Sequence, residues 1–335
     1  MLFLLKWISP NEVSSMTGTL CEVVMSEAVI KGVFNKEEAK HVLHCLVSNA
    51  TKPSTDYRFG RKVPDIYESL GYIPYNLYPY STSETLDYSY SDYAISLVAD
   101  YVGDIEVYER FHKRSLTYKQ LFDPITGFLR SKDEHGNFRE NFNPFDWGHD
   151  YIEGGAWQCA FSVFHDFKGL NELYHNKLSE KLDTLFSLKP HYNVSFYGRE
   201  IHEMSELASL DLGQCAISNQ PSFHIPFIYA TLGDIPKTHE VVKKMVKRFK
   251  PTIKGYPGDE DNGSMSCLYL FSMMGMYPIN PASGNYIISG PILDEVVIHL
   301  DKDLVIKKDK INLNTIKNEV SYFELIKGGN LHDKL

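Results

Sequence analysis

A carboxylate stands where a loop meets a helix in the stretch Asp150-Tyr151-Ile152-Glu153-Gly154-Gly155-Ala156-Trp157-Gln158. Two glycines follow Glu153, and glycine lets the backbone turn sharply or approach a ligand closely. The apolar run that begins at Ala156 predicts a helix anchored in a core. Taken alone, Glu153 is better explained as a favourable charge in the first turn of that helix. A catalytic role for it depends on two similar junctions further along the chain.

The second junction combines two amide side chains with a proline, in Gly213-Gln214-Cys215-Ala216-Ile217-Ser218-Asn219-Gln220-Pro221-Ser222-Phe223-His224. Pro221 suits the first position of a helix and Asn219 a capping or flanking position, so a well-capped helix is one interpretation. The alternative is that the side-chain oxygens of Asn219 and Gln220 are hard ligands for a cation such as calcium. His224 is more readily explained as a packed core histidine than as a ligand.

The third junction holds three consecutive acids between glycines, in Gly255-Tyr256-Pro257-Gly258-Asp259-Glu260-Asp261-Asn262-Gly263-Ser264. Adjacent carboxylates are costly unless they are solvated, paired or bound to a cation. An exposed acidic turn is the simplest interpretation. A helix rich in Met and aromatic residues follows directly, however, which indicates that the turn joins a buried element. The alternating acids and distal glutamate of an EF-hand are missing.

Two groups of carboxylates at helix starts fit the chemistry of glycoside hydrolysis. In that chemistry one carboxylic acid protonates the leaving oxygen, and one carboxylate activates a water on the opposite face of the sugar. Glu153 is the candidate acid, and the cluster Asp259-Glu260-Asp261 is the candidate source of the base. A helix N-terminus lowers the pKa of a carboxyl, so the apolar neighbours of Glu153 would have to raise it by desolvation.

Composition narrows the ligand class. The chain has 335 residues, of which 43% are hydrophobic, enough for one large core or two domains. A net charge of −9 argues against nucleic acid or an anionic membrane as the main partner and is compatible with a neutral substrate or a cation. The five cysteines lack a CxxC pair, which favours buried free thiols over a zinc site or disulfides. Apolar residues 1–8 are too short for a signal peptide, and no stretch is long enough to span a membrane, so the compartment stays open.

The sequence predicts about ten helices followed by a β-rich tail. An Asn35-x-x-Glu38 capping box starts the second helix, and Ser81-x-x-Glu84 opens a well-marked one. Residues 51–80 and 131–149 are predicted loops. The predicted helices cover 19–48 (two helices), 81–101, 105–122, 156–174, 176–186, 201–210, 222–232, 237–249 and 264–275, and the strands 285–290, 295–300 and 304–306. Successive helices without intervening strands suggest a helical toroid.

A series of motifs in this order resembles glycoside hydrolase family 92, the calcium-dependent, exo-acting α-mannosidases that invert the anomeric carbon. The matching blocks are Gly71-Tyr72-Ile73-Pro74, Ser83-Glu84-Thr85-Leu86-Asp87-Tyr88-Ser89-Tyr90, Leu121-Phe122-Asp123-Pro124, Glu153-Gly154-Gly155-Ala156-Trp157-Gln158, Asn219-Gln220-Pro221-Ser222, Gly258-Asp259-Glu260-Asp261-Asn262-Gly263-Ser264 and Asn280-Pro281-Ala282-Ser283-Gly284.

The resemblance implies a mainly α fold, a partial (α/α)6 toroid over residues 1–284. A C-terminal β-rich segment, residues 285–335, would pair with a β-sandwich domain that is absent here. By position, Glu153 is the general acid, and Asp261, with Asp259 beside it, is the base. The resemblance further implies a calcium ion held by Asn219, Gln220 and Asp261, and substrate contacts from Trp157, Glu84, Tyr88 and His224.

The chain also departs from the family pattern. The resemblance begins at Lys6-Trp7, inside the barrel, so the sandwich domain and the first barrel helices are expected to be missing. Gly155 replaces a common Asn, Phe223 a common His, and Ile217 a His that α-1,2-specific members often carry. Three hypotheses follow: an exo-α-mannosidase acting on terminal α-linked (first candidate α-1,2) mannose of a glycan or glycoprotein, a catalytically silent mannose- or calcium-binding homologue, and an inverting glycosidase of another sugar.

Overall fold

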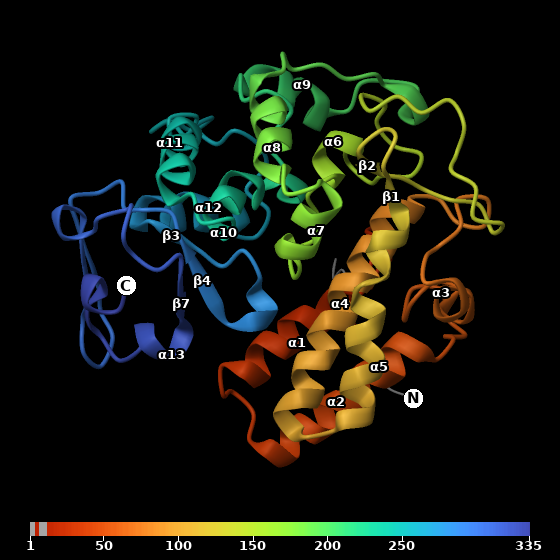
Figure 1. The fold of residues 1–335 in the computed structure, drawn as a ribbon, viewed down its shortest axis with the longest axis horizontal. Coiled ribbons are helices and arrows are strands. Elements are labelled where there is room, and N and C mark those ends of the chain that lie inside the picture. Colours follow the sequence, from red (N-terminus) through yellow and green to blue (C-terminus); the bar gives the residue numbers. More distant parts are fainter. Residues whose placement is uncertain (1–3, 7–11) are drawn as a thin grey trace. The chain divides into compact units, whose positions relative to one another are not determined.

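The computed structural model describes residues 4–6 and 12–335, which form two compact units (Figure 1). The first comprises residues up to Asp166 together with Tyr192–Arg199, and the second comprises Phe167–His191 and Glu200–Leu335. Both are built mainly from helices, which confirms the predicted fold class. The sixfold barrel and the boundary after residue 284 stay predictions. Trp7 and most of the apolar run at residues 1–8 lie outside the described ranges.

The first unit is organised around one long helix, α4 (Ser81–Val102). It packs against α1 (Cys21–Ile30), α2 (Lys36–Thr51) and α5 (Ile105–Ser115), which surround it in Figure 1. Their shared core consists of Val29, Ala39, Val42, Leu43, Leu46, Ala50, Ile95, Val98, Ala99 and Phe111. The unit is completed by α3 (Pro64–Leu70), α6 (Ala156–Cys159) and a hairpin of β1 (Phe122–Asp123) and β2 (Phe128–Leu129).

The structure confirms the predicted capping box at the start of α2. The Asn35 side chain accepts hydrogen bonds from the backbone N–H of Glu37 and Glu38, at 3.0 and 3.1 Å. The Glu38 carboxylate in turn accepts the Asn35 backbone N–H at 2.9 Å. Donors at the helix start that would otherwise lack partners are thus satisfied locally.

The second unit joins helices to two small sheets. Its helices are α7 (Phe167–Leu173), α8 (Leu178–Ser187), α9 (His202–Leu210), α10 (Ile228–Thr231), α11 (Ile235–Val246), α12 (Ser264–Met274) and α13 (Tyr322–Leu325). One sheet has the order β3 (Met276–Tyr277), β4 (Asn285–Ile288), β7 (Glu319–Ser321), all antiparallel. In the other, β6 (Leu304–Lys307) pairs antiparallel with β5 (Glu295–Ile298) and parallel with β8 (Gly329–Asn330). The three predicted strands after residue 284 are confirmed.

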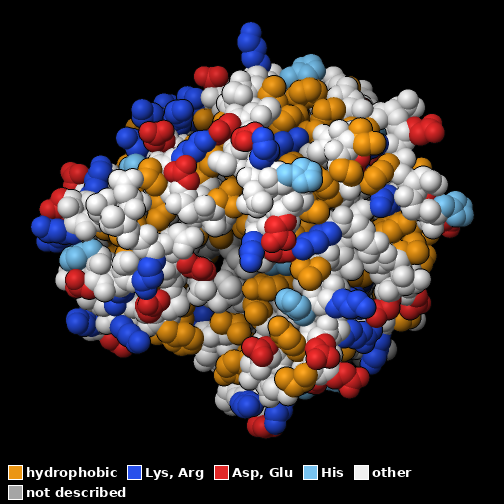
Figure 2. Space-filling view, in the orientation of Figure 1, with side chains coloured by type: hydrophobic (Ala, Val, Ile, Leu, Met, Phe, Trp, Pro, Cys, Tyr) orange, Lys and Arg blue, Asp and Glu red, His pale blue; other side chains and the backbone are white. Residues whose placement is uncertain are grey.

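The C-terminal strands share a core with the end of α12. Met276 and Ile288 from the first sheet cluster with Leu304 and Ile306 from the second, and Phe271 of α12 packs against this cluster. The strands therefore bury their apolar faces within the second unit. Over the face seen in Figure 2, Lys and Arg side chains interleave with Asp and Glu.

Several predicted elements differ in the structure. The predicted loop 51–80 contains α3, which begins with Pro64 at its first position and ends at Gly71 with φ +78°, the usual proline-start and glycine-stop of a helix. The helix predicted over 156–174 is interrupted between Cys159 and Phe167, where the N–H groups of Ser162 and Val163 donate to the carbonyl oxygens of Cys159 and Phe161 and not to carbonyls four residues back. The segment 222–232 is divided into a 3₁₀ turn, Ile225–Phe227, and the short helix α10, and Pro226, which has no N–H to donate to an α-helical ladder, lies in the 3₁₀ turn.

The cysteines are free thiols, as predicted, but only Cys159 and Cys215 are buried, whereas Cys267 is exposed. Burial raises the pKa of Cys159 to about 12, so this thiol is unreactive at neutral pH. Among the residues that the structure describes, no helix combines the length and apolar character needed to cross a membrane.

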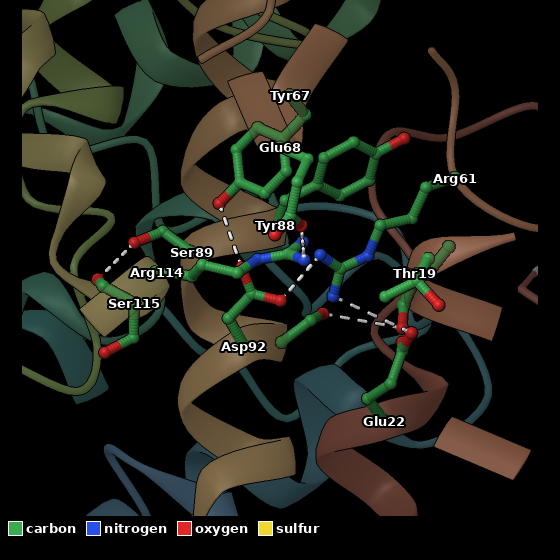
Figure 3. Close-up of polar contacts among 12 residues, drawn as sticks. Thr19, Glu22, Arg61, Tyr67, Glu68, Tyr88, Ser89, Asp92, Arg114 and Ser115 are labelled. Atoms are coloured by element: carbon green, nitrogen blue, oxygen red, sulfur yellow. Dashed lines mark hydrogen bonds and ion pairs between the residues drawn. The ribbon is translucent and has the colours of Figure 1, made fainter. Parts of the chain in front are cut away.

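A network of buried charges lies beside α4 (Figure 3). The Arg61 side chain is fully buried and pairs with Asp92 of α4 at 2.6 Å, with Glu22 of α1 3.9 Å away. Arg114 contacts the other Asp92 oxygen at 3.0 Å, and the Tyr67 hydroxyl donates to it at 3.1 Å. Each buried charge is compensated by an opposite one, so removal of a single member leaves an uncompensated charge in the core.

We expect Arg61→Met to destabilise the protein by about 3–5 kcal/mol, because Glu22 would lose its cationic partner in the core and Asp92 would keep only Arg114. The matched control is Arg58→Met, since the Arg58–Asp56 pair is 43% and 36% exposed and contributes at most about 1 kcal/mol. Chemical denaturation measures both. Equal losses for the two variants would contradict the assigned role of the network.

His165 is a half-buried titratable group in the same unit. Its ring stacks on Tyr93 with 5.2 Å between centroids, and Nε2 lies 2.8 Å from the Ser115 carbonyl oxygen, so the neutral ring donates there. Burial lowers the pKa of His165 to about 4, against the opposing charges of Asp166 and Asp92. The unfolded chain binds this proton near pH 6.5 and the folded chain does not, so the resulting stability is complete above pH 6.5 and falls as the pH drops toward 4.

We therefore expect His165→Gln, which keeps a donor for Ser115, to flatten the decline in unfolding free energy between pH 6.5 and 4. The difference between the two proteins in pH-dependent stability should reach at most about 2 kcal/mol at pH 5. Urea unfolding across this pH range measures it. Parallel curves for the variant and the parent would rule out His165 as the responsible group.

Candidate active site

Glu153 occupies a strained turn in the loop before α6. Its φ is +46°, a left-handed conformation that is uncommon for glutamate. The Glu153 backbone N–H donates to the Tyr197 hydroxyl at 3.1 Å, and the Gly154 carbonyl oxygen accepts from the Gly148 N–H at 3.0 Å. Glu153 itself is half-buried. Strained backbone persists where surrounding contacts enforce it, and such sites cluster where function requires a fixed geometry.

The same loop caps the central helix α4, which has no side-chain cap of its own. The Asp150 carbonyl oxygen accepts hydrogen bonds from the N–H groups of Thr82 and Ser83 at 3.0 and 3.2 Å. The Ser83 hydroxyl in turn accepts from the Ile152 N–H at 3.1 Å. The position of Glu153 is therefore tied to the first turn of α4.

An ion pair fixes Asp150 from its side-chain end. Arg139 donates to both Asp150 carboxylate oxygens, through Nη2 at 2.8 Å and through Nε at 3.0 and 3.1 Å, and the Ser131 hydroxyl also donates to this carboxylate. Sequence analysis missed Arg139, Ser131 and Tyr197 as supports of the loop. Asp150 lies in the stretch 150–158, but no sequence pattern near it identifies Arg139 and Ser131 as its partners.

Gly155 and Trp157 anchor the loop to the start of α6. A side chain at Gly155 would place its Cβ 2.7 Å from the Asp146 carbonyl oxygen, which explains the glycine at a position where the family commonly has Asn. The Gly155 N–H donates to the Gln158 side chain at 2.9 Å. Trp157 is 6% exposed and meets Phe128 edge to face at 5.0 Å. The aromatic anchor is as expected, while a substrate contact by Trp157 stays a prediction.

The second unit brings the two other junctions of the sequence together. Gln220 Nε2 lies 2.5 Å from Asp261 Oδ2 and 3.3 Å from the Ser264 hydroxyl. The Asn219 side-chain oxygen accepts the Gln220 backbone N–H at 3.0 Å, as an asparagine in a flanking position does. Any side chain at Gly258 would overlap the Ser218 carbonyl oxygen. The glycine thus permits the close approach of segments about 40 residues apart in sequence.

The three consecutive acids have different surroundings. Glu260 caps the turn: its carboxylate accepts the backbone N–H groups of Gly263 and Ser266 at 2.6 and 3.1 Å, and hydrogen bonds from Ser266 and Gly263 lower the pKa of Glu260. Asp261 has a φ of +45°, directly before α12. Asp259 is 70% exposed and lies 3.5 Å from His202 Nε2. Glu260 is therefore occupied in the fold, and its two neighbours are available for chemistry.

Three residues of α9, which are His202, Glu203 and Glu206, extend this acidic site and were not predicted from the sequence. His202 Nδ1 lies 2.9 Å from Glu203, so the ring lies between that carboxylate and Asp259. Burial raises the pKa of Glu206 to about 7, and the charges of Asp259 and Asp261 act in the same direction. The weak amphipathic pattern of residues 201–210 gave no indication that these side chains face the acidic turn.

The remaining predicted substrate contacts lie among buried side chains. Glu84 is 3% exposed and accepts the Gly18 N–H at 2.9 Å, while the Tyr88 hydroxyl accepts the Lys62 N–H at 2.5 Å. His224 is 2% exposed with its ring 6.4 Å from that of Phe167, as a core histidine would be. Contact of any of the three with substrate stays a prediction.

The chemistry of the donors near Asp261 fits calcium. Amide and carboxylate oxygens are the ligands that calcium prefers, and the Gln220 and Asp261 side chains already touch. Among the described residues, no group of three or more His, Cys, Asp and Glu is arranged to hold a metal. Calcium therefore stays a prediction that depends on amide ligands.

A mainly helical fold with half-buried and exposed carboxylates in turns before helices is compatible with the catalytic domain of a glycoside hydrolase. The sequence model of the Glycosyl hydrolase family 92 catalytic domain matches residues 2–332. The chain belongs to glycoside hydrolase family 92.

Known proteins of the family resemble the chain in structure and sequence. An inverting family 92 mannosidase from Bacteroides thetaiotaomicron matches with a TM-score of 0.85 at 32% identity, over 98% of this chain and 47% of that one. An α-mannosidase of the same organism, solved with mannoimidazole, has a TM-score of 0.81 at 24% identity, over 96% of this chain and 45% of its own. A protein of Arthroderma benhamiae described as an uncharacterized secreted glycosidase is 26% identical, over 85% of this chain and 38% of its length. The chain thus spans less than half the length of these relatives.

We expect Gly258→Ala to destabilise the protein by about 1–3 kcal/mol, because the added methyl group would collide with the Ser218 carbonyl. The control is Gly154→Ala, where the nearest atom to the new Cβ is 3.3 Å away in the Gln158 side chain, so a smaller loss is expected. Thermal unfolding measures both variants. A Gly258 variant as stable as the control would contradict the close approach of the two segments.

Proposed function

We propose that this chain is the catalytic part of an exo-acting α-mannosidase that releases terminal α-linked mannose from glycans with inversion. The observation that carries the proposal is that two candidate carboxylates of a family 92 chain, Glu153 and Asp261, both occupy left-handed turns directly before helices. The similarity to an inverting mannosidase at 32% identity supports the same substrate class. Mannose-containing glycans or glycoproteins, including N-glycans, are the proposed substrates.

In this mechanism Glu153 is the general acid. Its carboxyl donates a proton to the glycosidic oxygen as the bond to the anomeric carbon lengthens, so the leaving sugar departs as an alcohol. The acid must be protonated before each turnover. Glu153 is half-buried, between the buried Tyr151 and Gly154.

Asp261 is the proposed general base, with Asp259 beside it. An Asp261 oxygen takes a proton from water while that water attacks the anomeric carbon on the face opposite the leaving group, which inverts the configuration. Gln220 contacts Asp261 Oδ2 and holds the carboxylate in one orientation. The exposed Asp259 has access to solvent and is the proposed route by which the proton leaves.

Asn219, Gln220 and Asp261 are the proposed calcium ligands, with water and sugar hydroxyls completing the six to eight that calcium takes. When bound, calcium would supply positive charge that polarises the sugar hydroxyls. The residues' own part is to present hard oxygen donors from a turn that is fixed by Gly258 and Glu260. We also propose that residues 1–284 form a partial (α/α)6 barrel and residues 285–335 a β-rich segment.

Linkage specificity is the part of the proposal that the family pattern supports least. Ile217, at the position where α-1,2-specific members often have His, is fully buried, and Phe223 is 6% exposed. Neither side chain can donate a hydrogen bond to a sugar. The α-1,2 linkage is nevertheless the first to test, because it is the first candidate from the family resemblance. The α-1,3 and α-1,6 linkages, or another sugar, are the alternatives.

The test measures mannose released from α-1,2-linked mannobiose with and without EDTA. We expect release that chelation abolishes and added calcium restores, and we expect Glu153→Gln to lower turnover by about 10²–10⁴-fold because the acid is lost. Calcium binding by this variant should be unchanged. The control is Glu109→Gln, on the exposed face of α5.

The outcomes separate the hypotheses. Release that ignores EDTA would refute the calcium site, and full activity of Glu153→Gln would refute the acid. Binding of mannose or calcium by a folded protein that releases no sugar from any α-linkage would establish the silent homologue instead.

A further inference from the structure

The first unit contains an open cleft of about 670 Å³ beside the loop that carries Glu153. Its walls come from the segment 130–151, together with the half-buried ring of Tyr75. This volume lies within the range of small-molecule sites, about 300–1,000 Å³. Residues 131–149 were predicted only as a loop, and the proposed mechanism assigns no role to the cleft.

Both arginines of the cleft are already neutralised. Arg139 forms the ion pair with Asp150, and Arg130 contacts Asp123 at 2.6 Å. Their guanidinium groups also stack on rings: Arg139 lies 4.0 Å from the centre of Tyr75, and Arg130 lies 4.3 Å from that of Phe142. Planar groups thus line the cleft, and their positive charge is matched within the fold.

The acids that remain make the cleft unfavourable for anions. Asp133, Glu140 and Asp146 line it and form no ion pair with any residue that the structure describes. Hydrogen bonds from the side chain and the backbone of Asn137 lower the pKa of Asp133. Lys132, whose amine lies 4.6 Å from the Phe138 ring centre, offsets only one of these charges. A phosphate or carboxylate ligand would therefore be repelled.

The rim instead suits hydroxyl groups. Exposed Asn137, Glu140, Asn141 and His149 offer both donors and acceptors around rings that are half-buried. A neutral, hydroxyl-rich ligand can hydrogen-bond to such a rim and lay an apolar face on the rings. Saccharides combine these two properties.

The cleft and the acid share one segment of backbone. Gly148 to Tyr151 line the cleft, and Glu153 follows two residues later, within about 7 Å of chain. Asp150 belongs to both, because its side chain holds Arg139 in the cleft wall and its carbonyl caps α4. A ligand in the cleft therefore lies against the loop that sets the position of Glu153.

We propose that this cleft binds neutral sugar residues of the glycan, beyond the mannose that is released. The inference rests on the proposed function for the identity of the sugar. It assigns to the segment 130–151 the task of holding the remaining part of an oligosaccharide, so that the chain would favour extended substrates over disaccharides.

The experiment measures binding, by isothermal titration calorimetry, of α-linked mannotriose and of methyl α-mannoside to protein carrying Glu153→Gln, which keeps the ligands intact. The cleft is altered by Glu140→Ala with Asn141→Gly, where glycine suits the φ of +55°. A second variant, Glu140→Trp, fills the cleft from its exposed rim. Asn314→Ala, an exposed amide of the second unit, is the control.

We expect both cleft variants to weaken mannotriose binding by about tenfold and to leave methyl α-mannoside binding within about twofold. Unchanged mannotriose affinity in both variants, or no mannotriose binding at all, would overturn the inference. Activity of the Glu153-containing protein is measured in parallel. If mannotriose binding depends on the cleft but the protein shows no turnover, the inference stands and the proposed hydrolysis is refuted. If the protein turns over but binding does not depend on the cleft, the proposed hydrolysis stands and the inference is refuted.

Discussion

The Asp150 carbonyl oxygen accepts two hydrogen bonds from the first turn of α4, and much of the first unit depends on this contact. α4 is 22 residues long and packs against α1, α2 and α5, so it is the scaffold of the unit. Its first N–H groups have no side-chain cap, and their partners come from the loop that carries Glu153. The stability of the helix and the placement of the acid thus have one common cause.

The second unit solves a similar problem with a close backbone approach. Gly258 lies directly against Ser218, and the turn that follows runs through three left-handed residues into α12. Glu260 satisfies the backbone N–H groups of this turn. Because one acid stabilises the turn, its two neighbours are exposed on it in fixed positions. A run of like charges that would be unfavourable on a flexible loop becomes an ordered acidic site.

Local patterns in the sequence predicted the features whose causes are local. The Asn35 capping box and the C-terminal strands each follow from residues within a few positions of one another. The Ser81-x-x-Glu84 pattern marked where α4 begins, but the side-chain cap does not form and the distant Asp150 carbonyl takes its place. The pairs Arg61–Asp92 and Arg139–Asp150 have no local signature, since neither partner indicates where the other will lie after folding. The interruption after Cys159 was missed because no glycine or proline marks it in residues 160–166. The carboxylates could be chosen from their glycine-rich turns, but their supports could not.

The cap that Asp150 provides to α4 is made by the main chain, not by a side chain. Substituting residues one at a time leaves a carbonyl group at this position whatever the new side chain is. A mutational scan would consequently underrate this contact, although the Asp150 carboxylate, Glu153 and Gly155 are each constrained for reasons of their own. The spacing is a separate sensitive property: inserting or deleting one residue between 150 and 153 would shift the carboxylate relative to the helix. Evolution and protein engineering alike should therefore find changes of spacing in this loop more damaging to the cap of α4 than changes of side chain.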